Sequence, residues 1–84
     1  MVISPSAIQK VAYELRSRGR VPCFVATAPE DYHDSRCAYG LADEDILQIA
    51  GMMVLPVYSP TAMDTPGSFL TFTMESELVH GGVS

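Results

Sequence analysis

The sequence contains no tryptophan and only two cysteines, Cys23 and Cys37, in 84 residues. Two cysteines are too few for the set of disulfides that holds small secreted domains together, and their separation excludes a C-x-x-C redox motif. Hydrophobic residues make up 48% of the chain, which excludes a disordered or low-complexity protein. Because a chain of this length can bury only one modest core, we expect a single domain over residues 1–84.

Positive charge is also scarce. Five Lys and Arg stand against ten Asp and Glu, giving a net charge of −5, and no basic residue follows Arg36. A nucleic-acid-binding protein needs several cations to displace counterions from phosphates, so direct nucleic-acid binding is disfavoured. Arg16, Arg18 and Arg20 cluster near the end of the first expected helix, where cations favour the helix dipole. The acidic excess indicates a basic protein partner, or serves solubility alone.

No uninterrupted apolar run reaches the length of a membrane span. Residues 46–63 carry no charge over 18 positions, but Gly51, Pro56 and Pro60 interrupt them, so we expect no membrane contact. The first residues also lack the basic region and apolar core of a signal peptide. Together with the low cysteine content, these features predict a cytoplasmic protein.

The clearest element is a helix that opens at Ser4-Pro5 and ends at Gly19. Serine suits the N-cap and proline the first helical position, and the following apolar residues recur with helical spacing at Ile8, Val11, Ala12 and Leu15. Residues 21–27 (VPCFVAT) are short, apolar and typical of a buried strand. For residues 29–40 we expect one irregular turn of helix; a short helix that opens at Pro29 and ends at Gly40, or a loop, are the alternatives.

A second helix is predicted over residues 42–50, with acidic residues in its first turn and Gly51 as its cap. Residues 54–58 and 68–75 read as strands, and Pro56 favours an edge position for the former. Residues 78–84 are expected to form a frayed tail. The expected fold is therefore α+β, in the order α-β-α-β-β, with a three-stranded mixed sheet and the helices packed on one face. The last strand would lie between the other two and run antiparallel to both.

Residues with potential for catalysis or metal binding do not form a recognisable motif. Structural zinc sites pair their ligands closely, whereas only His33 and Cys37 are suitably spaced among the candidates Cys23, His33, Cys37 and His80. A Cys–His–Asp arrangement around Cys37 lacks an accompanying nucleophile turn or oxyanion loop. We therefore expect a non-enzymatic protein without a metal or cofactor, and keep a small enzyme or metal protein as a third alternative.

The leading hypothesis is that the protein binds a larger protein with a basic surface. Tyrosines often anchor interfaces, and here they lie among carboxylates. One concrete version is an inhibitor that covers a nucleic-acid-binding surface, as small acidic phage proteins directed against host defence do, anti-CRISPR proteins included; this analogy rests on size and composition. The predicted partner-binding residues are Glu30, Asp31, Tyr32, Asp34, Tyr39, Asp43, Glu44 and Asp45. A simpler interpretation is that these acids only form a solvated surface, and that those at the start of the second predicted helix stabilise its dipole.

The alternative hypothesis is a structural or assembly subunit that self-associates, as a homodimer for example. In the expected fold one face of the sheet is left without helices, and Phe69 with Met52 and Met53 would form the apolar seam there. Apolar association tolerates salt, whereas charge-led binding weakens with it. The salt dependence of binding therefore separates the two hypotheses.

Overall fold

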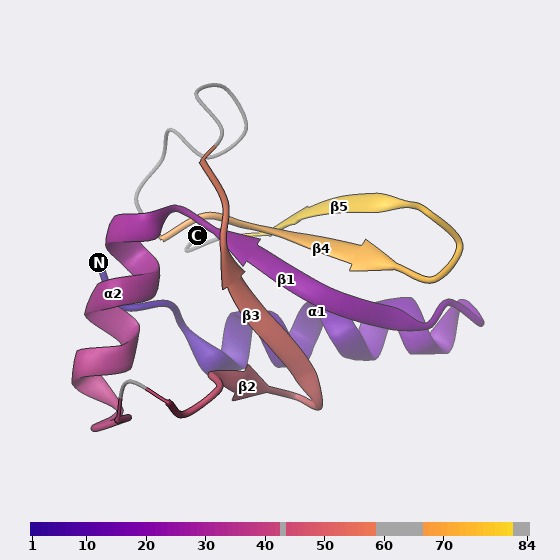
Figure 1. The fold of residues 1–84 in the computed structure, drawn as a ribbon. Coiled ribbons are helices and arrows are strands. Elements are labelled where there is room, and N and C mark those ends of the chain that lie inside the picture. Colours follow the sequence, from indigo (N-terminus) through magenta and orange to yellow (C-terminus); the bar gives the residue numbers. More distant parts are fainter. Residues whose placement is uncertain (43, 59–66, 82–84) are drawn as a thin grey trace.

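The computed structural model describes residues 1–42, 44–58 and 67–81, which form a small α+β fold with two helices and one five-stranded mixed sheet (Figure 1). None of the described helices is long and apolar enough to cross a membrane. In chain order the elements are α1 (Pro5–Ser17), β1 (Pro22–Thr27), α2 (Pro29–Ala38), β2 (Gln48–Ile49), β3 (Met52–Pro56), β4 (Phe69–Thr73) and β5 (Leu78–Gly81).

The first helix forms as the sequence predicts. The Ser4 hydroxyl accepts a hydrogen bond from the Ala7 backbone N–H at 3.3 Å, and Pro5 occupies the first turn. Three members of the predicted apolar stripe, Ile8, Ala12 and Leu15, are buried. The predicted strands over residues 21–27 and 68–75 are also confirmed as β1 and β4 with slightly shorter bounds.

The number and order of the strands differ from the prediction. The sheet has the order β2-β3-β1-β4-β5, so β1, and not the last predicted strand, lies at its centre. β1 pairs in parallel with β3 and antiparallel with β4. The prediction that Pro56 marks an edge fails for β3 as a whole, because β2 flanks this strand at Met52 and Met53. The Val57 N–H donates to the Thr27 carbonyl on β1, so the nitrogen of the neighbouring Pro56 faces away from β1. No residue of β2 lies opposite Pro56 on that side, because β2 pairs only with Met52 and Met53.

The helix predicted over residues 42–50 is absent from the described part of the chain, and a hairpin lies in its place. Ala50 and Gly51 have φ values of 54° and 78° and join β2 to β3 as a two-residue turn. Leu47 and Ile49 are buried while Gln48 between them is exposed, which is the alternation of a strand. Gly51 thus adopts its positive φ in the turn of a hairpin and not at the end of a helix.

Two further segments are more ordered than expected. Residues 29–38 form the regular helix α2 instead of an irregular turn. Residues 78–81 form β5 instead of a frayed tail, because they pair with β4 over four residues; residues 82–84 lie outside the described chain. Gly81 faces Phe69 across this pair, and a Cβ atom at Gly81 would lie 2.5 Å from the Phe69 ring. The glycine therefore provides the space that the ring occupies.

The main core lies between the helices and one face of the sheet. Both α1 and α2 contribute to it, although the second helix on this face is residues 29–38 and not the predicted helix over residues 42–50. Phe69 is only 1% exposed and Met52 is equally buried, so both belong to this core and not to an open seam. The buried cluster consists of Ile3, Ile8, Ala12, Val25, Leu47, Ile49, Met52, Val54 and Phe69.

Candidate functional site

The second face of the sheet carries an apolar surface formed by four strands. Successive side chains of a strand point to opposite faces, so the neighbours of the core residues Val25, Val54 and Phe69 point away from the helices. We call this surface the open face. Its residues are Phe24 and Ala26 of β1, Met53 and Leu55 of β3 with Val57 beyond it, Leu70 and Phe72 of β4 with Met74 beyond it, and Leu78 and His80 of β5.

Two stacked phenylalanines lie at the centre of the open face. The rings of Phe24 and Phe72 are 4.5 Å apart between centroids and 15° from parallel, and the two residues are directly paired across β1 and β4. Three residues of the face are exposed, since Met53 is 38%, Leu78 50% and Met74 70% accessible. Ala26 and Leu70 are buried in a second apolar cluster, against which Val57 and Phe72 pack. Large apolar residues exposed around such a cluster are typical of an interaction site.

The open face differs from the remaining surface in its charge. None of its described residues is Asp, Glu, Lys or Arg, although the whole chain carries a net charge of −5. Methionine side chains adapt to the shape of a partner because they are unbranched and polarisable. The open face can thus bury apolar area against a partner without desolvating a charged group.

The structure uses several predicted partner-binding acids within the fold. The Met1 ammonium donates to Asp31 Oδ1 at 3.0 Å and to Asp34 Oδ2 at 2.6 Å. Asp31 is only 4% exposed, and its second oxygen accepts the Gly67 N–H at 2.9 Å. The carboxylates of Asp34 and then Asp31 raise the pKa of the Met1 ammonium to about 10, and the ammonium in turn lowers the pKa of Asp34.

The two tyrosines of this segment also have partners inside the fold. Tyr39 donates its hydroxyl to the Ile3 carbonyl at 2.8 Å, and partial burial raises the pKa of its phenol. Tyr32 packs against the main core, and its ring lies below the Arg36 guanidinium at 5.6 Å from the ring centroid. Arg36 also donates to the carbonyl oxygens of Ala42 and Asp45. The arginine thereby connects α2 to the turn that follows it.

The remaining predicted acids are more accessible. The Asp45 carboxylate accepts the Ala42 N–H at 3.0 Å and stays exposed, as are Glu30 and Glu44. Asp43 lies outside the described residues. The structure therefore brings Asp31, Asp34 and Tyr39 together around the first residues of the chain and leaves Glu30 and Glu44 on the surface.

The cysteines and histidines are spread over the molecule. Cys37 Sγ lies 3.7 Å from His33 Nε2, one turn away on α2, whereas Cys23 lies on β1 and His80 on β5. Both cysteines are free and exposed. Within residues 1–42, 44–58 and 67–81, no group of three or more His, Cys, Asp or Glu side chains could hold a metal ion.

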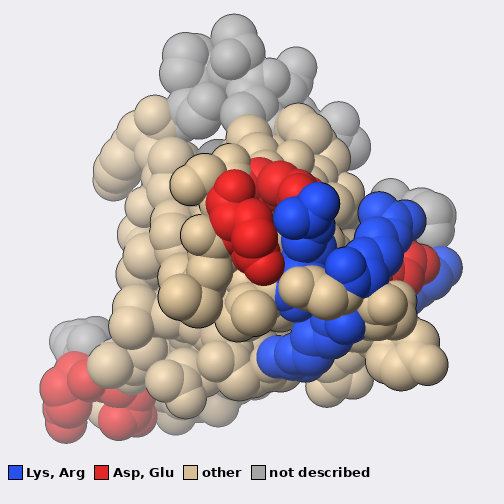
Figure 2. Space-filling model, turned by 90° about the vertical axis from the view of Figure 1, so that its right-hand side faces the viewer, with Lys and Arg blue, Asp and Glu red and all other residues tan. Residues whose placement is uncertain are grey.

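Most of the basic side chains gather along α1 and the turn after it. Figure 2 shows them as one cluster beside acidic side chains. Two of these arginines have partners within the fold, because Arg20 Nη2 lies 2.9 Å from Glu77 Oε1 and Arg16 Nη2 donates to the Ala50 carbonyl at 3.1 Å. Part of this cluster therefore connects α1 to both sheet hairpins.

Sequence reasoning predicted an uncovered apolar face of the sheet but placed the wrong residue of β4 on it. Phe69 was expected there and is instead buried in the main core, whereas Leu70 and Phe72 point to the face without helices. The pairing of Phe24 with Phe72 was missed, and only the register of β1 on β4 reveals it. No family model matches this chain, and neither does any curated protein or solved structure, so the open face is the candidate site on its own physical properties.

Proposed function

We propose that this protein is a non-enzymatic assembly subunit that pairs with a second copy of itself through the open face. The observation that carries the proposal is an apolar surface centred on the stacked Phe24 and Phe72, with Met53, Met74 and Leu78 exposed around them and no charged residue among its described members. Two copies that each carry a net charge of −5 can meet on this face without opposing like charges. Sheet-on-sheet packing about a two-fold axis uses the same residues from both copies.

The size of the face sets the expected strength of the dimer. Strands about 4.8 Å apart that rise about 3.3 Å per residue give a sheet of this size a flat outline of roughly 400 Å². This is about half of the roughly 800 Å² that each partner contributes to a standard stable interface. We therefore expect a reversible dimer that dissociates on dilution, and apolar burial should make it insensitive to salt.

Sedimentation velocity over a range of protein concentrations tests the proposal. The wild-type protein should shift from monomer to dimer with increasing concentration, to the same extent at low and high salt. Met53→Glu and Leu78→Glu place a charge on exposed parts of the face and should leave the protein folded but monomeric. Tyr13→Glu is the matched control, since Tyr13 is 75% exposed on α1. A wild-type protein that stays monomeric at every concentration would refute the proposal.

The exposed acids support a second candidate function, the binding of a basic protein partner. Glu30 and Glu44 are exposed, whereas the basic residues other than Arg36 lie along α1 and the turn after it. In this version the protein would act as an inhibitor that occupies a nucleic-acid-binding surface. A partner captured from host lysate should then be released at moderate salt, and Glu30→Gln with Glu44→Gln should weaken its capture. Capture that persists at high salt would argue against this function.

A further inference from the structure

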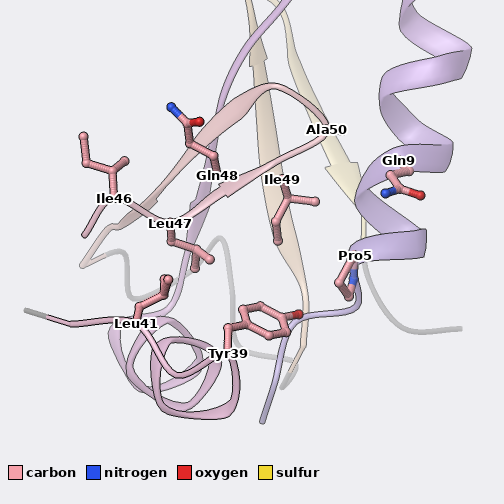
Figure 3. A pocket seen from close by; sticks show the side chains of 9 residues that line it. All are labelled: Pro5, Gln9, Tyr39, Leu41, Ile46, Leu47, Gln48, Ile49 and Ala50. Carbon is pink, nitrogen blue, oxygen red and sulfur yellow. The ribbon is translucent and has the colours of Figure 1, made fainter.

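A hollow of about 410 Å³ lies at the β2 edge of the sheet, on the side of the helices (Figure 3). The start of α1 and the end of α2 border it, and β2 with the residues before it forms a third wall. Leu47 and Ile49 point into the same space as Tyr39 and Leu41, whereas Gln48 points away. The hollow belongs to a different part of the molecule from the open face.

Apolar side chains dominate the walls of the hollow. Ile46 is 59% exposed, although it is a large aliphatic residue, and Leu41 is only partly buried. Gln9 of α1 supplies a polar group on the opposite wall, while the Tyr39 hydroxyl is already bonded to the Ile3 carbonyl. An apolar hollow with few polar groups, of a volume between about 300 and 1,000 Å³, is typical of a site that accepts a ligand side chain or a small molecule.

The backbone of β2 is arranged to pair with a further strand. Ile49 and Met52 flank the two-residue turn, and the Val54 N–H donates to the Leu47 carbonyl at 2.8 Å. Ile49 with Met52, and Leu47 with Val54, are therefore the hydrogen-bonded pairs of the hairpin. Gln48 and Met53 form the non-hydrogen-bonded pair between them. The N–H and C=O of Gln48 consequently point away from β3, at the outer edge of the sheet.

Charge at one end of the hollow indicates the kind of segment that fits it. Glu44 and Asp45 are exposed and directly precede Ile46. Arg36 of α2 is bound to the carbonyl oxygens of Ala42 and Asp45, and Arg16 lies at the other end of the hollow, where it donates to the Ala50 carbonyl. No basic residue follows Arg36 in the sequence. The surface beside Ile46 therefore presents two carboxylates that favour a cationic side chain.

We propose that the β2 edge binds an extended peptide segment of another protein, which adds as a strand beside Gln48. An apolar side chain of this segment enters the hollow, and a Lys or Arg next to it lies against Glu44 and Asp45. Main-chain hydrogen bonds supply part of the affinity in this mode of recognition, and the pocket supplies the specificity. The proposal does not require dimer formation, because the hollow lies on the helix side of the sheet; only the Gln48 side chain, paired with Met53, reaches the rim of the open face.

Selection from a phage-displayed library of random twelve-residue peptides tests the proposal on the full chain. Peptides enriched on the wild-type protein should share an apolar residue next to Lys or Arg. Gln48→Pro removes the outward N–H without removing a hydrogen bond to β3, and should weaken the selected peptides at least tenfold. Gln48→Thr retains the N–H and is the matched control, with unchanged affinity expected. Ile46→Asp should also abolish binding, and circular dichroism verifies that each variant is folded.

Three outcomes would overturn the proposal. One is a selection without enrichment, and another is a set of peptides that binds Gln48→Pro as well as wild type. The third is a bound peptide that changes the NMR signals of Phe72 and Leu78 rather than those of residues 46–49. Sedimentation of Gln48→Pro keeps the two proposals distinguishable, because this variant should dimerise like the wild type whether or not peptides bind.

Discussion

Thr71 is fully buried in β4, and among the described residues its hydroxyl has no hydrogen-bond partner. A buried hydroxyl without a hydrogen bond destabilises the folded state, because the hydrogen bonds it made to water in the unfolded state are not replaced. Thr71→Val has nearly the same shape and removes that cost, so we expect the free energy of unfolding to rise by about 1 kcal/mol. Urea denaturation monitored by circular dichroism measures the change.

Thr27 provides the matched control for this substitution. It is equally buried, but its Oγ1 donates to the Ala28 carbonyl at 3.3 Å. Thr27→Val should therefore bring no gain in the free energy of unfolding, because it removes a hydrogen bond together with the hydroxyl. Equal effects of the two substitutions would show that the Thr71 hydroxyl is not the source of the cost.

The hairpin between β4 and β5 contains a residue in an unfavourable backbone conformation. Ser76 has a φ of 64°, in a turn where its N–H and the Thr73 N–H donate to the carbonyls of Thr73 and Glu77 at 3.1 Å each. This three-residue loop favours glycine at the left-handed position. Ser76→Gly should raise the free energy of unfolding by about 0.5 kcal/mol. The gain from removing the strained backbone of Ser76 exceeds the additional conformational entropy that glycine loses on folding.

The neighbouring Glu75 distinguishes conformational relief from a general effect of glycine in the loop. Its φ is not positive, so Glu75→Gly gives no relief and also removes the carboxylate that accepts the Val21 N–H at 3.1 Å. We expect this variant to be less stable than the wild type in the same urea titration. A gain for both variants would contradict the assignment of strain to Ser76.

Elements that depend on local signals were predictable from the sequence, and elements that depend on a distant strand were not. The first helix follows from Ser4, Pro5 and a stripe of apolar residues within one segment. The segment around Gly51 fits a helix end as well as a hairpin turn, and pairing of Gln48 with Met53 decides for the hairpin. β5 depends in the same way on its register against β4.

At the scale of the whole molecule, the position of the candidate site depends on which face of the sheet the helices cover. The alternation of β4 separates Phe69 from Phe72, but the sequence does not determine which of them meets α1 and α2. The fold resolves this through long-range contacts, and it also turns Asp31 and Tyr39 toward the first residues of the chain. Composition alone therefore could not reveal that Asp31 and Asp34 bind the Met1 ammonium within the fold.

The first residue of the chain is bound to α2 across 33 positions, which predicts a pH dependence of stability. Asp34 and Asp31 raise the pKa of the Met1 ammonium from 8.0 to about 10, so the folded state holds this proton more tightly than the unfolded state. The contribution is fully present below pH 8.0 and is lost as the pH rises through about 10. Because the ammonium lowers the pKa of Asp34 below 3.8, the same contact also weakens in acid, once the pH falls below that value.

Asp34→Asn isolates this contribution, because Asp34 is the main cause of the raised pKa of Met1 and, unlike Asp31, its side chain is 42% exposed. In urea titrations of chains that begin at Met1, the stability difference between wild type and Asp34→Asn should be largest between pH 5 and 8 and should shrink toward pH 11. A difference that stays constant across the alkaline range would mean that Asp34 acts through its shape or its helix position, and that the first residue is not held by charge.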